Sequence, residues 1–216
     1  MESQRSTEWF QKRKGRITGS ISGAVLGLNP WMSKEDVMRS WVRDALGAER
    51  EFSGNAATQY GVFNEDNAIS DLELDHGYDV VDTGFHTYED WLGASPDGLI
   101  GDDTVLEVKT PYGKRKGGEF KPLSEQLHYY AQVQLEMLCT GRSKAIFYQW
   151  SPLSSKLEHI PQDNEWLDEN LPKLRLFYDQ FLKELESPQK HLEPKSIAIR
   201  DDLFQLLDIC LIIEIY

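Results

Sequence analysis

The chain has 216 residues, enough for one well-buried domain and short for two. Its net charge of −13 argues against a protein that coats nucleic acid through a uniformly basic surface. Its two cysteines, Cys139 and Cys210, exclude a disulfide framework, a zinc ribbon and a four-cysteine iron–sulfur cluster. The N-terminus has no apolar signal region, and no run of about 18 uncharged apolar residues occurs. We therefore expect a cytoplasmic protein without a membrane span.

Helical patterns dominate the first third of the chain. Apolar residues at helical spacing predict helices over Ile21–Leu28, Lys34–Leu46 and Ala56–Leu72. Ser33 followed by Asp36 is a capping pattern for the second of these helices, and Gly47 ends it.

The pattern then changes to short runs rich in Val, Thr, Tyr and Phe. Between Tyr78 and Thr110 these runs are broken by Gly and Asp, which predicts three antiparallel strands. Further along we expect a helix over Leu123–Thr140, a strand pair over Lys144–Trp150 and Lys156–Ile160, and a helix over Glu165–Glu186 that is bent at, or begins at, Pro172. This order of elements favours an α/β sandwich with a mixed sheet.

No internal repeat or Pro/Ser-rich linker divides the chain, so a single domain over residues 1–216 is predicted. Its core is expected at about 9–160, followed by a C-terminal helical segment at about 163–216. Residues 201–216 are more apolar than an ordinary tail. They are either an element packed on the core, a docking surface for a partner, or a stretch foreign to the protein.

The most informative pattern is a carboxylate-bearing hairpin. Glu107 and Lys109 share one face of a strand, while Val108 points to the other, and a Gly/Asp turn brings Asp97 opposite Glu107. Two carboxylates and the backbone carbonyl of Val108 are hard oxygen ligands for Mg²⁺ or Mn²⁺. Lys109 would orient the metal-bound water or take its proton. By spacing alone, a structural hairpin with a surface ion pair is the more common explanation.

Residues outside the hairpin extend this hypothesis. Glu65 on the third helix is a candidate third carboxylate, or a solvent-facing glutamate. Gln132 and Tyr129 share one side of the helix after the hairpin, where a buried amide needs partners such as water or phosphate. Near the N-terminus, the fork of Arg13 and the hydroxyls of Thr18 and Ser20 suit a phosphate, although helix caps of this kind are common.

The distribution of charge fits the same hypothesis. No Lys or Arg occurs between Glu51 and Val108, where carboxylates are frequent. Basic residues gather in clusters at 12–16 and 109–121. A carboxylate-rich centre between basic clusters suits metal ions that recruit an anionic substrate. Solvated surface charges would give the same pattern.

Several segments in series resemble one family. WFQKRKGRITGS, GLNPWMS, YGVFNEDNA, ASPDG, LEVKTP and YYAQVQ occur in the order found in the phage lambda exonuclease, or YqaJ-type viral recombinase, family. The resemblance covers about Trp9 to Met137. It implies an α/β fold with the type II restriction-endonuclease-like PD-(D/E)xK core, a mixed central sheet flanked by helices.

The resemblance also implies roles for individual residues. Asp97, Glu107 and the Val108 carbonyl resemble the metal ligands of the family, and Lys109 resembles its water-positioning lysine. Glu65 resembles the helical glutamate near the metal in the family, and Gln132 resembles the glutamine beside the site. Arg13 and Ser20 resemble the residues that hold the 5′-phosphate. Thr18 and Tyr129 remain candidate phosphate or DNA contacts.

The activity implied is an Mg²⁺-dependent 5′→3′ exonuclease using two ions, with Mn²⁺ as a substitute. Such an enzyme degrades one strand of linear double-stranded DNA and leaves a 3′ overhang for recombination. The family further implies a homotrimer, a single-strand annealing protein as partner, and a phage or prophage origin. Two alternatives stay open: a site-specific endonuclease on the same core, and a DNA- or protein-binding module without catalysis.

Overall fold

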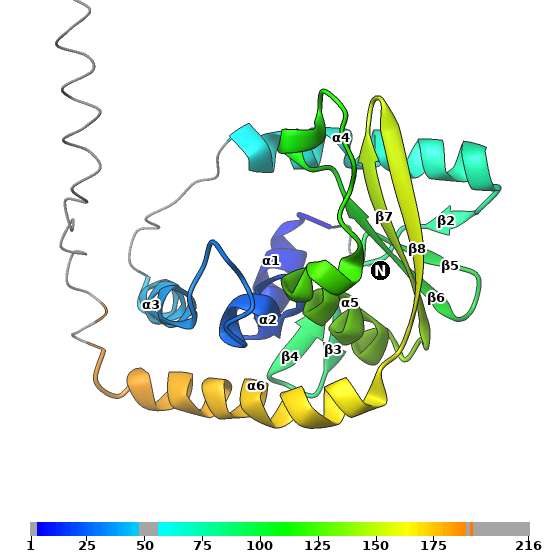
Figure 1. The fold of residues 1–216 in the computed structure, drawn as a ribbon. Helices are drawn as coiled ribbons and strands as arrows, with labels where there is room; N and C mark the ends of the chain where they lie inside the picture. Colours follow the sequence, from blue (N-terminus) through cyan, green and yellow to red (C-terminus); the bar gives the residue numbers. More distant parts are fainter. Residues whose placement is uncertain (1–3, 48–55, 189–190, 192–216) are drawn as a thin grey trace, which may run out of the picture.

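The computed structural model describes residues 4–47, 56–188 and 191. Figure 1 shows helices packed around a strongly twisted sheet. The helices are α1 (Thr7–Arg13), α2 (Gly19–Val25), α3 (Lys34–Ala45), α4 (Ala56–His76), α5 (Leu127–Thr140) and α6 (Asn164–Glu184), with short 3₁₀ turns η1 (Tyr112–Lys114) and η2 (Leu123–Glu125). The strands are β1 (Ile17–Thr18), β2 (Val80–Val81), β3 (His86–Tyr88), β4 (Leu92–Ala94), β5 (Gly98–Ile100), β6 (Thr104–Lys109), β7 (Lys144–Ser151) and β8 (Ser154–Pro161).

The larger sheet has the strand order β2-β5-β6-β7-β8. Strands β6 and β7 are parallel and are joined through α5, whereas the other neighbours in this sheet pair antiparallel. A parallel pair requires a crossover, which α5 supplies. The predicted α/β class with a mixed sheet is therefore confirmed.

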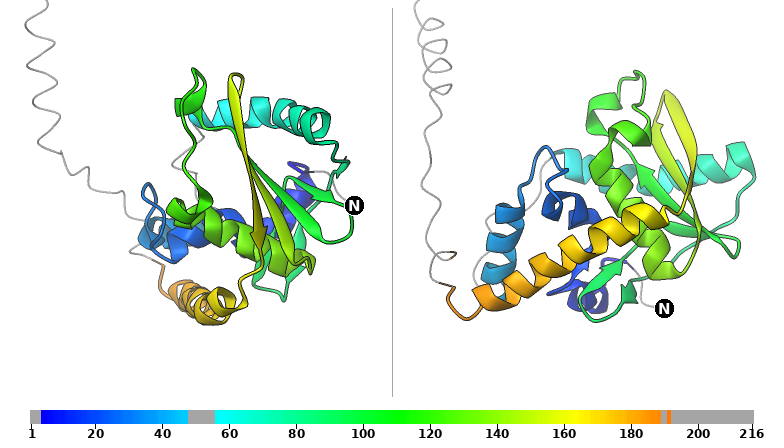
Figure 2. Two further views of the ribbon diagram at one scale, coloured as in Figure 1. Left: turned by 45° about the vertical axis from the view of Figure 1, so that its right-hand side comes forward. Right: turned by 60° about the horizontal axis from the view of Figure 1, so that its bottom comes forward.

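Helices cover both faces of this sheet. On one face, Val105 and Phe147 pack with Val133 and Met137 of α5. On the other face, Leu106, Val108, Ile146 and Tyr148 pack with Ala68 and Leu72 of α4. A third cluster joins α2, α3 and α6. Helix α6 runs along the bottom of the molecule in Figure 1 and crosses its front in the right-hand view of Figure 2. The alternation of VLEVK thus supplies an apolar residue to each helix layer and leaves Glu107 on the α5 side.

The segment from Tyr78 to Thr110 differs from its prediction. It forms five strands rather than three, and they belong to two sheets. Strands β3 and β4 form the smaller sheet with β1, because Ile17 and Thr18 pair in parallel with Leu92 and Gly93. Because β1 lies so far before β4 in the chain, no local sequence pattern indicates that the two strands pair.

Other boundaries shift for local reasons. The first predicted helix begins at Gly19 and ends at Val25, and the helix predicted from Leu123 is interrupted at Gln126, whose φ and ψ are −122° and 62°. Helix α6 begins after Asp163, whose side chain accepts a hydrogen bond from the Trp166 amide, so a start at Pro172 is wrong. The capping box of Ser33 and Asp36 is confirmed. Residues 201–216, including Cys210, lie outside the described residues.

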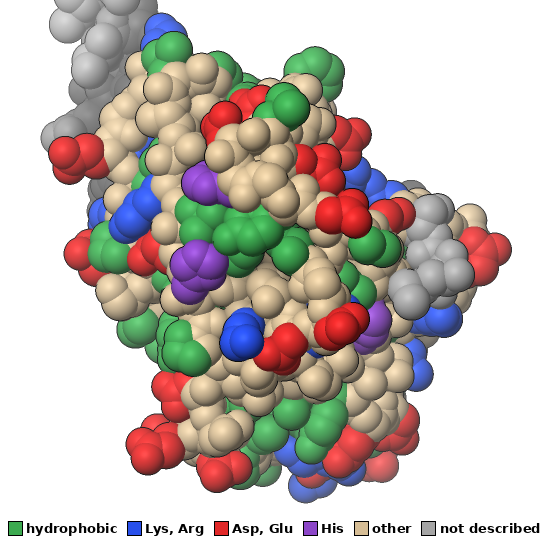
Figure 3. Space-filling model, turned by 90° about the vertical axis from the view of Figure 1, so that its right-hand side faces the viewer, with side chains coloured by type: hydrophobic (Ala, Val, Ile, Leu, Met, Phe, Trp, Pro, Cys, Tyr) green, Lys and Arg blue, Asp and Glu red, His purple; other side chains and the backbone are tan. Residues whose placement is uncertain are grey.

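The face shown in Figure 3 carries side chains of both charges. Acidic side chains lie scattered among basic and hydrophobic ones there. Within the described residues, none of the helices combines the length and apolar character that crossing a bilayer needs.

Candidate active site

The hairpin of β5 and β6 brings Asp97 to Glu107. Gly98 pairs with Leu106, and the Asp97 amide donates to the Leu106 carbonyl at 3.0 Å, so the register places Asp97 opposite Glu107. The carboxylate of Asp97 accepts a hydrogen bond from the Val108 amide at 2.7 Å. The turn at 101–103 and the strand alternation thus assemble the predicted ligand pair and hold it in place.

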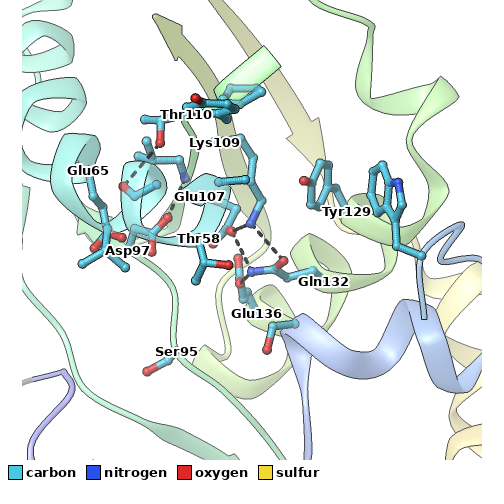
Figure 4. A pocket seen from close by; sticks show the side chains of 18 of the residues that line it. Thr58, Glu65, Ser95, Asp97, Glu107, Lys109, Thr110, Tyr129, Gln132 and Glu136 are labelled. Carbon is cyan, nitrogen blue, oxygen red and sulfur yellow. Dashed lines mark hydrogen bonds and ion pairs between the residues drawn. The ribbon is translucent and has the colours of Figure 1, made fainter. Parts of the chain in front are cut away.

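A network of side chains surrounds Glu107 on the α5 side. Lys109 Nζ forms an ion pair with Glu107 Oε1 and donates to Gln132 Oε1 at 3.2 Å. The amide of Gln132 donates from Nε2 to Glu107 Oε1 at 2.6 Å and to Glu136 Oε1 at 2.9 Å. Gln132 thereby uses both amide hydrogens on carboxylates and its oxygen on the ammonium, which fixes its orientation (Figure 4).

These residues line one cavity of about 760 Å³. Glu65 and Thr58 of α4 lie on one side of it, and Gln132 and Tyr129 of α5 lie on the other (Figure 4). Arg13 and Ser20 line the same cavity. The structure therefore brings every predicted site side chain except Thr18 to a single cavity, whose shape and lining are those of a binding site.

Asp97, Glu136 and Glu65 in this cavity have raised pKa values. Burial, together with the charges of Glu107 and Glu65, raises the pKa of Asp97 well above its ordinary value. Burial and Glu107 do the same to the pKa of Glu136. Burial also raises the pKa of Glu65, and the cation of Arg5 opposes that rise. Several buried carboxylates near one another favour either protons or a bound cation.

Lys109 behaves differently because carboxylates surround it. Burial acts to lower its pKa, but the neighbouring Glu107, Tyr129 and Asp97 outweigh burial and hold the pKa above its ordinary value. Its ammonium also lies 4.6 Å from the centre of the Tyr129 ring. Lys109 is therefore a charged hydrogen-bond donor in this structure.

The donor set fits a divalent metal ion. Glu107 Oε2 and Glu136 Oε2 are buried and lack a hydrogen-bond partner, which is costly for a carboxylate unless a cation or water completes the site. Among the described residues, no group of three or more His, Cys, Asp or Glu side chains is arranged to hold a metal. Asp97, Glu107 and the Val108 carbonyl form a smaller set. That set suits Mg²⁺, which keeps several of its waters and takes one or two carboxylates.

Glu65 has an arginine partner that its place in the sequence did not indicate. Its Oε2 accepts a hydrogen bond from Arg5 Nη2 at 2.7 Å, and the pair is partly exposed. Glu65 still lines the cavity and interacts electrostatically with Asp97 and Glu107. It lies where a carboxylate near the metal is expected, with its charge already balanced by an arginine.

The predicted phosphate-binding residues meet at the start of α2. Arg13 Nη2 donates to Ser20 Oγ at 3.2 Å, and its guanidinium lies 4.1 Å from the centre of the Trp9 ring. Burial lowers the pKa of Arg13 to about 10, which still leaves it charged at neutral pH. Thr18 is buried and bonds to Ser20 Oγ at 3.2 Å without lining the cavity. Thr18 therefore contacts Ser20, and its role as a phosphate or DNA contact stays a prediction.

One arginine of the second basic cluster lies next to a residue that lines the cavity. Tyr112 lines the cavity, and the guanidinium of Arg115 lies 3.8 Å from the centre of the Tyr112 ring. This contact holds a cation of the segment 112–116 close to the site.

The sequence interpretation missed Glu136, which lines the cavity, and Arg5, which pairs with Glu65. Glu136 lies four residues after Gln132, and that spacing places both on one helix face, so the signal was present. Arg5 left no signal, because its partner Glu65 lies 60 residues away. Gln134, on the same helix, does not line the cavity. It bonds to the Pro161 carbonyl and the Asp163 amide, where β8 leads into α6.

Comparisons with known proteins agree with this fold. The family model of the YqaJ-like viral recombinase domain matches residues 8–143. The chain is similar to LHK-Exo, an alkaline exonuclease from Laribacter hongkongensis, with a TM-score of 0.71 and 27% identity over 86% of this chain and 97% of that chain. LHK-Exo has also been solved in complex with dAMP, with the same overall similarity to this chain. A phage related exonuclease from Haemophilus somnus 129PT is similar at a TM-score of 0.62 and 18% identity, over 79% of this chain and 96% of that chain. No curated protein sequence matches the chain. These similarities confirm the predicted restriction-endonuclease-like core.

Proposed function

The chain belongs to the YqaJ-like viral recombinase family, and we propose that it is an Mg²⁺-dependent 5′→3′ exonuclease acting on linear double-stranded DNA. The similarity to an alkaline exonuclease over most of both chains supports the reaction class. The observation that carries the proposal is that Asp97, Glu107 and Lys109 line the same cavity as Arg13 and Ser20. Residues suited to cleavage and residues suited to a terminal phosphate thus share one binding site.

Each residue has a physical role in this proposal. Asp97, Glu107 and the Val108 carbonyl would hold Mg²⁺, which lowers the pKa of a bound water and offsets charge on the phosphate. Lys109 would donate a hydrogen bond to the attacking water and so orient it. Gln132 holds the Lys109 ammonium and Glu107 in fixed relation through its hydrogen bonds.

The end of the DNA would be held on the other side of the cavity. Arg13 offers a charged, forked donor, and the Ser20 hydroxyl lies beside it, which suits a terminal 5′-phosphate. Tyr129 and Tyr112 line the cavity and would contact the DNA, and Arg115 lies beside the Tyr112 ring. Degradation from that end would leave a 3′ overhang. The homotrimer, the annealing partner, the second metal ion and the phage or prophage origin stay predictions.

Digestion of a linear duplex with one strand labelled at a time tests the proposal. We expect Mg²⁺ to support shortening of the strand with the 5′-phosphate at the end, with the complementary strand intact, and EDTA to stop it. Covalently closed circles should be spared, because they offer no end. Equal cutting of circles would favour an endonuclease, and no cutting under any condition would favour a binding module.

Arg13→Ala should reduce the preference for 5′-phosphorylated over 5′-hydroxyl ends by about ten- to a hundredfold, the usual size of one lost charge-assisted hydrogen bond. The preference is measured as the ratio of initial digestion rates on the two ends. Arg16→Ala is the matched control, because Arg16 lies three residues away, bonds to the Lys12 carbonyl and does not line the cavity. An unchanged ratio in Arg13→Ala would remove its assigned role.

A further inference from the structure

One aromatic side chain at the cavity wall is unusually open to solvent. Trp31 is 76% exposed, whereas three other tryptophans, Trp9, Trp91 and Trp150, are buried. Its backbone is fixed despite this exposure, because Asn29 Oδ1 accepts hydrogen bonds from the amides of Trp31 and Met32 at 2.9 and 3.2 Å. Trp31 nevertheless lines the cavity that contains the catalytic candidates. The indole of Trp31 is therefore a flat apolar surface that is held in the wall of the cavity and is open to a ligand.

Contacts between rings connect Trp31 to the centre of the site. Its ring packs edge-to-face with His128 at 5.2 Å, an arrangement that leaves much of the indole open. His128 lies 4.0 Å from the Tyr129 ring, and Tyr129 lies under the Lys109 ammonium. Gly23 of α2 presses against His128, since a Cβ there would come within 2.6 Å of it. The position of Trp31 relative to Lys109 is therefore set by tight packing of α2 on α5.

The chemistry of the cavity changes from its centre to its rim. The centre carries carboxylates, a lysine and an arginine, which suit a metal and phosphates. Trp31, Val62 and Tyr112 also line the cavity, and they are 76%, 47% and 38% exposed. A nucleotide joins a phosphate to a flat aromatic base, and each such base stacks well on an exposed aromatic ring. A peptide partner would account for the exposed apolar side chains at the rim. It would not account for their position in the same cavity as residues that suit phosphates.

We propose that Trp31 is the stacking surface for a nucleobase of the DNA end that the cavity holds. The proposal rests on the proposed function, because the cavity must receive DNA. It adds a contact to the base, which the phosphate-directed residues at the centre do not supply. Trp31 would thus help to set how the terminal nucleotides lie while the scissile phosphate is held beside Lys109.

The test uses duplexes that carry 2-aminopurine at successive positions of each strand near one end, titrated with the protein in EDTA so that no strand is cut. We expect the fluorescence of one or two adjacent positions to be quenched on binding, and Trp31→Ala to abolish that quenching. Trp31→Ala should also weaken end binding by about five- to a hundredfold, and Trp31→Phe should retain most of the affinity. Met32→Ala is the matched control, because Met32 is 44% exposed on the same loop but does not line the cavity.

An abasic nucleotide at the quenched position completes a double-mutant cycle. On this DNA the wild-type protein and Trp31→Ala should bind with the same affinity, because there is no base left to stack. Quenching that persists in Trp31→Ala, or an affinity loss that is the same with and without the base, would overturn the proposal. Failure of the proposed function looks different, since the wild-type protein would then leave labelled linear duplex intact with Mg²⁺.

Discussion

Lys109→Ala is expected to lower the rate of DNA cleavage by at least about a hundredfold, the usual cost of removing one charged group aimed at the reacting atoms. Lys109 lies on β6 with its ammonium bound to Glu107 and Gln132, so its position is fixed before substrate arrives. Neighbouring carboxylates hold its pKa above the ordinary value in spite of burial. We therefore expect Lys109 to orient the water as a donor rather than to take its proton.

The measurement is single-turnover digestion of a labelled duplex, together with the affinity for a duplex end in EDTA. Affinity should change little, because Arg13 and Ser20 lie on a different part of the cavity. Lys144→Ala is the matched control, since Lys144 begins the neighbouring strand β7, is 67% exposed and pairs only with Asp103 among the ion pairs of the described residues. Robust cleavage by Lys109→Ala would contradict a mechanism in which Lys109 orients the attacking water.

Asp97→Asn is expected to abolish the stabilisation that Mg²⁺ gives the protein, and to abolish cleavage with it. A ligand at about 100 times its Kd adds about 2.7 kcal/mol to the free energy of unfolding. For a chain of this size that raises Tm by about 5–10 °C. Thermal unfolding with and without Mg²⁺ measures the shift. Asp103→Asn is the control, because Asp103 lies in the turn of the same hairpin and bonds only to Ser143 and Lys144 in the described structure.

The rise in Tm that Mg²⁺ causes should depend on pH. Burial and neighbouring carboxylates raise the pKa of Asp97, so its protonated form is favoured in the metal-free fold. Protonation of Asp97 stabilises the metal-free fold. Its contribution to the free energy of unfolding is complete below the ordinary pKa of aspartic acid and is lost as pH rises through the raised pKa. Mg²⁺ binds the ionised carboxylate, so its stabilising effect should grow over that same rise in pH. A Tm shift that is independent of pH, or that survives in Asp97→Asn, would contradict this assignment.

The local chemistry of the site follows from short-range patterns in the sequence. Alternation in VLEVK fixed the side of β6 on which Glu107 and Lys109 lie, because successive residues of a strand point to opposite faces. The Gly/Asp turn set the register that brings Asp97 to Glu107. Helical spacing predicted that Gln132 follows on a helix above them, and the same rule would have found Glu136. These features depend on contacts between residues close in the chain, or on a simple repeat.

Which distant segments come together at the site depends on the packing of whole elements. Arg5 reaches Glu65 across 60 residues, and β1 pairs with β4 in the smaller sheet although Leu92 lies 75 residues after Ile17. The position of Trp31 at the cavity depends on the packing of Gly23 against His128. Nothing local marks such pairs, because they are selected by the packing of whole elements rather than by neighbours in the sequence. The raised pKa values of Asp97 and Glu136 have the same origin, since burial and mutual repulsion exist only once the elements have packed together.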